Sequence, residues 1–74
     1  MPASEALRAR LVDEDSLARL HVALERASRA GVAFHDIWPG WLERAASCFE
    51  PRDEAWDVLH EQREGYRSAY EASV

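Results

Sequence analysis

Three histidines and one cysteine are the residues of this 74-residue chain best suited to metal binding or nucleophilic catalysis. No two of His21, His35 and His60 are four residues apart, the spacing that places two zinc ligands on one face of a helix. Cys48 belongs to an apolar run, which argues against a lowered thiol pKa. We therefore expect no catalytic residue, no metal site and no cofactor, and we interpret Cys48 as a small buried hydrophobe.

The sequence also lacks the motifs that bind phosphate or build a hydrolase nucleophile. The three glycines are scattered, the chain has no lysine, and no G-x-S-x-G pattern occurs. Small and apolar residues around Gly31 weakly match a helix-turn-helix, with residues 33–39 as its recognition segment. This segment offers no Arg, Lys, Asn or Gln to contact a base edge, which disfavours sequence-specific DNA binding.

Carboxylates are concentrated in the last third of the chain. Residues 1–49 hold seven acids and six arginines, a net charge of −1, whereas residues 50–74 hold seven acids and three arginines, a net charge of −4. On a continuous helix these seven carboxylates fall within one arc of about 100° that no arginine interrupts. They are Glu50, Asp53, Glu54, Asp57, Glu61, Glu64 and Glu71. We interpret this arc as a docking surface for a basic protein; the alternative is a solvated face that keeps the chain soluble.

Large aromatic residues cluster between Phe34 and Phe49. They are expected to fill the core of a small helical protein. Trp38 and Trp41 together exceed what so small a core readily buries, so an alternative places part of their surface at a homodimer or partner interface.

Helices must position these residues, because the apolar spacing is helical and no strand-like alternation occurs. A leucine stripe predicts a helix over about 15–30, with acidic residues at its start and Gly31 after its end. A wide apolar arc predicts a central helix over about 36–49, with Asp36 as its N-cap and Pro39 in its first turn.

Pro51 is suited to begin a last helix over about 51–72. Within it, Gly65 indicates a close helix contact or a bend. A short additional helix is expected over about 4–12. The sequence therefore predicts an all-α fold, with residues 1–74 forming one domain built as a three-helix bundle plus this short N-terminal helix.

Composition restricts the compartment and the partners. A lone cysteine forms no intramolecular disulfide, the N-terminus lacks the apolar run of a signal peptide, and no segment approaches the ~20 apolar residues of a membrane span. These features predict a cytoplasmic protein. The net charge of −5 disfavours binding to nucleic acid or to an anionic membrane.

The leading hypothesis is a small non-enzymatic interaction or regulatory module that binds a basic protein through the acidic arc or exposed aromatic residues. One alternative is an inhibitor that mimics the phosphate row of nucleic acid, since carboxylates on one helix face repeat about every 5 Å. Another is a small dimeric DNA-binding regulator that uses arginines. These are Arg8, Arg10, Arg19, Arg26 and Arg29.

Overall fold

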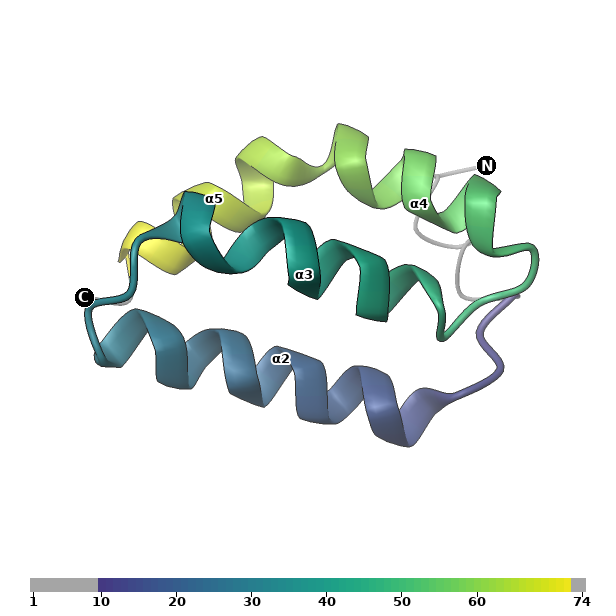
Figure 1. Cartoon of the computed structure of the whole chain (residues 1–74), viewed down its shortest axis with the longest axis horizontal. Coiled ribbons are helices and arrows are strands. Elements are labelled where there is room, and N and C mark those ends of the chain that lie inside the picture. Colours follow the sequence, from purple (N-terminus) through teal and green to yellow (C-terminus); the bar gives the residue numbers. More distant parts are fainter. Residues whose placement is uncertain (1–9, 73–74) are drawn as a thin grey trace.

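The computed structural model of the chain describes residues 10–72, which contain four α-helices and no β-strand. The helices are α2 (Glu14–Arg29), α3 (Phe34–Ala46), α4 (Arg52–Glu61) and α5 (Arg63–Ala72). Figure 1 shows α3 between α2 and α4, with α5 continuing from α4. The predicted all-α class is confirmed.

The helix expected over 4–12 lies outside the described residues, apart from its last three positions. These three are not helical: they form a turn and an isolated antiparallel bridge in which Leu11 pairs with Phe49. The bridge is held by backbone hydrogen bonds from Val12 to the carbonyl of Cys48 at 2.8 Å and from Glu50 to the carbonyl of Arg10 at 3.0 Å.

The ends of α2 follow the expected signals. The Asp13 carboxylate caps the helix by accepting the Ser16 backbone N–H at 3.1 Å and the Ser16 hydroxyl at 2.7 Å. Acidic residues fill the first turn, where they stabilise the positive end of the helix dipole. After the helix, Gly31 adopts a φ of 80°, a left-handed conformation that glycine reaches without a steric penalty.

Helix α3 begins and ends earlier than expected. Phe34 is its first residue and Ala46 its last, so Asp36 lies in the first turn rather than at the N-cap, and Pro39 lies inside the helix. Proline there removes one backbone hydrogen bond. The helix nevertheless continues, because Phe34 and the apolar residues on either side of Pro39 pack into the core. Starting the helix at Phe34 brings that ring into the same buried face.

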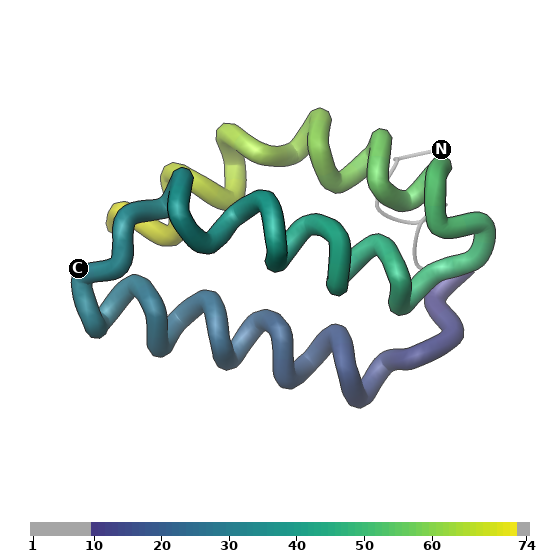
Figure 2. The backbone as a smooth tube through the Cα atoms, in the orientation of Figure 1, coloured from purple at the N-terminus to yellow at the C-terminus, as the bar shows by residue number. Residues whose placement is uncertain are grey.

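The expected single helix over 51–72 is divided at Gln62 into α4 and α5. Figure 2 shows the chain path changing direction between them. The division lets α4 pack on α3, while α5 contacts both α2 and α3. The break lies at Gln62 rather than at Gly65, and Gly65 makes no close contact, because a Cβ atom there would meet nothing within 4 Å.

The core surrounds α3 and is rich in aromatic rings. Trp38 packs against Phe34, Trp41 and Tyr66 at centroid distances of 5.2, 5.3 and 5.4 Å. Two hydrogen bonds tie neighbouring helices to this core: the Trp41 indole N–H donates to the Leu20 carbonyl at 2.7 Å, and the buried Ser28 hydroxyl donates to a carbonyl of α5 at 2.6 Å. Within residues 10–72, no helix is long and apolar enough to cross a membrane.

Candidate interaction surface

Helix α4 presents the carboxylates that the sequence singled out. Its buried side consists of Ala55 and Leu59, which pack into the core. Asp53, Asp57 and Glu61 are exposed and follow one another at intervals of four residues, so they line one side of the helix. Glu50 is also exposed, but it lies in the turn before α4, and helical geometry therefore does not align it with the other three.

Arginines contact four of the seven carboxylates, contrary to the expectation of an uninterrupted acidic arc. The Glu54 carboxylate pairs with Arg10, and Asp53 pairs with its neighbour Arg52 at 3.2 Å. On α5, Glu64 pairs with Arg63 at 2.9 Å and with Arg67 at 3.4 Å, and Glu71 pairs with Arg67 at 3.4 Å. The arc was drawn for one straight helix, and the break at Gln62 separates its two halves.

Three of the predicted carboxylates have no ion pair with any described residue: Glu50, Asp57 and Glu61. Asp57 and Glu61 are four residues apart on α4 and repel one another. The negative charge free to contact a partner is therefore concentrated around α4, not α5. The acidic surface therefore extends along α4 only, about half of the length expected for a single helix over 51–72.

A shallow groove of ≈ 210 Å³ lies beside these carboxylates, between α3 and α4. It is lined by Glu43, Arg52, Asp53, Trp56 and Asp57. The half-buried Trp56 donates its indole N–H to Glu43 at 3.1 Å and stacks on His60, with ring centroids 4.9 Å apart. Arg52 also pairs with Glu43, which fixes the Glu43 carboxylate between the two helices.

The sequence analysis did not single out Trp56 or Glu43. Trp56 lies between Asp53 and Asp57, a pattern that could have indicated an aromatic residue within an acidic surface. Glu43 comes from a different helix, and only the packing of α3 against α4 brings it close. We define the α4 acidic surface as Glu43, Asp53, Trp56, Asp57 and Glu61.

Trp38 and Trp41 are buried and are therefore not the exposed aromatic residues that were expected at an interface. Each is only 3% exposed, and both rings stack within the core. The alternative that they are exposed at an interface is thereby corrected. Their exposure was overestimated because α5 covers them: Tyr66 packs against both rings.

The structure also shows the surroundings of the residues considered for nucleophilic catalysis and metal binding. Cys48 is a buried free thiol that donates a hydrogen bond to the Arg44 carbonyl at 3.5 Å, and burial raises its pKa, so the reactive thiolate is disfavoured. His21 contacts the rings of Trp41 and Tyr66, whereas His35 is exposed beside Asp36. Across residues 10–72, no group of three or more His, Cys, Asp or Glu is placed to hold a metal ion.

No known protein family, curated protein or solved structure shows significant similarity to this chain.

Proposed function

We propose that this chain is a small non-enzymatic interaction module that binds a basic protein segment through the α4 acidic surface. The observation that carries the proposal is the pair Asp57 and Glu61. Both carboxylates are exposed and have no cationic partner among the described residues, although nearby carboxylates are paired with arginine. Like charges four residues apart cost stability, so a basic partner that neutralises them would gain that energy on binding.

Trp56 adds a second kind of contact to this surface. An arginine or lysine side chain is attracted both to carboxylates and to the face of an indole ring. The groove places Trp56 beside Asp57, the lining carboxylate without an ion pair to a described residue, so a single cationic side chain can contact both. This arrangement favours binding of a basic peptide over non-specific attraction of small cations.

The inhibitor that mimics nucleic acid is less well supported. It requires a long row of free carboxylates, whereas the break at Gln62 and the ion pairs of Glu64 and Glu71 interrupt the row. The DNA-binding regulator is also less well supported, because Arg10, one of its arginines, is paired with Glu54. Burial of the tryptophans also removes the argument for a homodimer built on them. The buried free thiol supports a reducing compartment such as the cytoplasm.

Titration of a fluorescent oligoarginine peptide tests the proposal with two charge-matched variants. Asp57→Asn/Glu61→Gln and Glu64→Gln/Glu71→Gln each remove two negative charges, which changes the net charge from −5 to −3. We expect the first variant to bind about tenfold more weakly and the second to stay within about twofold of the original chain. Equal losses in the two variants would show that net charge alone attracts the peptide and would overturn the proposal, as would a complete lack of binding.

A further inference from the structure

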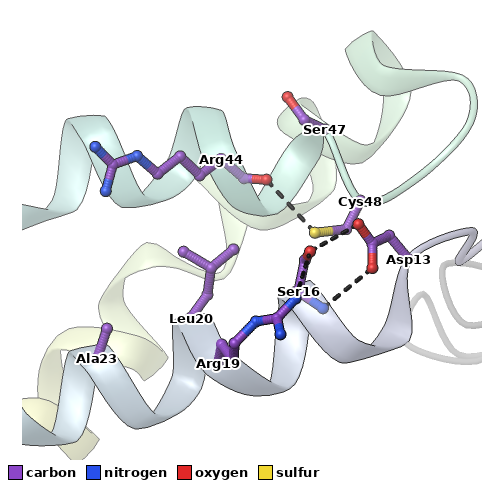
Figure 3. Close-up of a pocket in the computed structure, with 8 residues that line it drawn as sticks. All are labelled: Asp13, Ser16, Arg19, Leu20, Ala23, Arg44, Ser47 and Cys48. Atoms are coloured by element: carbon purple, nitrogen blue, oxygen red, sulfur yellow. Dashed lines mark hydrogen bonds between the residues drawn. The ribbon is translucent and has the colours of Figure 1, made fainter.

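A second groove lies between α2 and α3 at the end of the molecule where α2 begins. Its volume is ≈ 510 Å³. The residues that line it are Asp13, Ser16, Arg19, Leu20, Ala23, Arg44, Ser47 and Cys48, as Figure 3 shows. Leu20, Ala23 and Cys48 make part of this lining apolar. From the sequence, Arg19 and Cys48 were considered only singly, as a DNA-contacting arginine and a nucleophile candidate, and nothing brought the residues of this groove together.

Arginines of this groove are free to contact a partner. Arg19 donates a 3.5 Å hydrogen bond to the Ser16 hydroxyl, and its charge contributes to lowering the pKa of Asp13, but it forms no ion pair with a described residue. Arg44 likewise has no ion pair within the described part of the chain. In contrast, the arginines near α4 and α5 are paired with carboxylates. Those paired residues are Arg10, Arg52, Arg63 and Arg67. The arginines that form no direct ion pair with a described carboxylate therefore include both arginines of the groove.

The one carboxylate that lines the groove, that of Asp13, already accepts hydrogen bonds. Asp13 accepts the backbone N–H and the hydroxyl of Ser16, and these hydrogen bonds hold its pKa below its ordinary value. Figure 3 shows both interactions at the N-terminus of α2, beside Cys48. Asp13 therefore acts as a helix cap and is not positioned to neutralise Arg44.

The apolar lining distinguishes this groove from a simple anion site. Burial raises the pKa of the Cys48 thiol, so the side chain is neutral and presents an apolar sulfur. Leu20 is partly buried against the core, and Ala23 is an exposed small residue that leaves room for an incoming side chain. A ligand that fills the groove must carry an apolar group in addition to negative charge.

We propose that the groove between α2 and α3 docks an acidic segment of a second protein, with an apolar side chain against Leu20, Ala23 and Cys48. Carboxylates of that segment contact Arg19 and Arg44 at the rim. Nucleic acid fits less well, because its phosphates offer nothing to the apolar part of the lining.

This surface differs from the α4 acidic surface in charge and in place. Figure 1 shows α2 and α4 on opposite sides of α3, so both surfaces can be occupied together. The groove does not depend on the proposed role of α4, and each surface can be tested alone.

The experiment uses a labelled amphipathic peptide of glutamate and leucine, and a second peptide in which serine replaces leucine. Fluorescence anisotropy would compare the original chain with Arg19→Gln/Arg44→Gln and with Arg26→Gln/Arg29→Gln. Both double variants change the net charge from −5 to −7, but the second alters no residue that lines the groove. Circular dichroism would verify that each variant stays helical. If the first variant does not fold, Ala23→Asp provides an exposed substitution within the groove.

We expect the leucine peptide to bind about tenfold more weakly to Arg19→Gln/Arg44→Gln, and to bind the other double variant within about twofold of the original chain. Ala23→Asp should weaken binding in the same direction. Equal losses in the two double variants would overturn the proposal. It would also be overturned if the leucine peptide did not bind, or if the serine peptide or a DNA oligonucleotide bound as tightly.

Discussion

Asp57 is the residue at which stability and binding should respond in opposite directions. In α4 it has Asp53 four residues before it and Glu61 four residues after it, and it has no ion pair with a described residue. Each like-charge pair at this spacing costs about 0.2–0.5 kcal/mol. Asp57→Asn removes two such repulsions without a large change in helix propensity, so the free energy of unfolding should rise by about 0.4–1 kcal/mol.

This gain is measurable in so small a protein. For a domain of this size, 1 kcal/mol shifts Tm by about 4–8 °C, so Asp57→Asn should raise Tm by about 2–8 °C at low salt. Thermal unfolding followed by circular dichroism would measure the shift. The gain should shrink at about 1 M salt, where exposed charges are screened. The same variant should bind oligoarginine more weakly than the original chain.

Glu64→Gln is the matched control for this prediction. It also removes one exposed carboxylate, but Glu64 pairs with Arg63 and Arg67 and lies in the first turn of α5, where a negative charge is favourable. Its Tm should therefore fall slightly, with little change in peptide binding. A Tm for Asp57→Asn that is unchanged or lower would refute the reasoning, because it would mean that a cation already compensates Asp57.

Three further predictions concern the fold. Ser28→Ala should lower the free energy of unfolding by about 1–3 kcal/mol in urea titrations, because it leaves the Tyr70 carbonyl without its buried donor; an unchanged midpoint would contradict the packing of α5 on α2. Gly65→Ala should stabilise the chain by about 0.4–1 kcal/mol, since nothing lies within 4 Å of the added methyl, whereas Gly31→Ala should destabilise it because of the φ of 80°. Burial raises the pKa of Cys48 above 9.0, so the folded chain holds this proton more tightly than the unfolded chain. The resulting stability should be complete below about pH 9 and decrease above it, and Cys48→Ala should flatten that decrease in denaturation curves measured across this range.

Local signals predicted α2 well, and tertiary contacts account for most of the differences elsewhere. The acidic start and Gly31 set the limits of α2 within one or two residues. Phe34 belongs to α3 because its ring is buried against Trp38, one helical turn later, and against Tyr70 of α5; the Tyr70 contact is tertiary, and nothing near Phe34 in the sequence indicates it. The break at Gln62 is also explained by tertiary contacts, because it lets Tyr66 of α5 cover Trp38 and Trp41. Neither Gln62 nor its immediate neighbours is a helix-breaking residue.

For the candidate surface, too, the local sequence predicts some features and tertiary packing determines the others. The carboxylates of α4 could be predicted because they are spaced at intervals of four residues. Their pairing could not, because Arg10 reaches Glu54 from a segment far away in sequence. Glu43 joins Trp56 for the same reason: α3 and α4 pack side by side, and this places a carboxylate of one helix at the indole of the other.

Chemical-shift mapping by NMR tests the central claim most directly. Oligoarginine would be titrated into the isotopically labelled chain, and the backbone amides and the indole N–H groups would be followed. The proposed α4 acidic surface predicts that the largest shifts occur at the amides of Asp53, Asp57 and Glu61 and at the indole of Trp56, with small changes along α2. Shifts confined to α2, or spread evenly over all four helices, would contradict it.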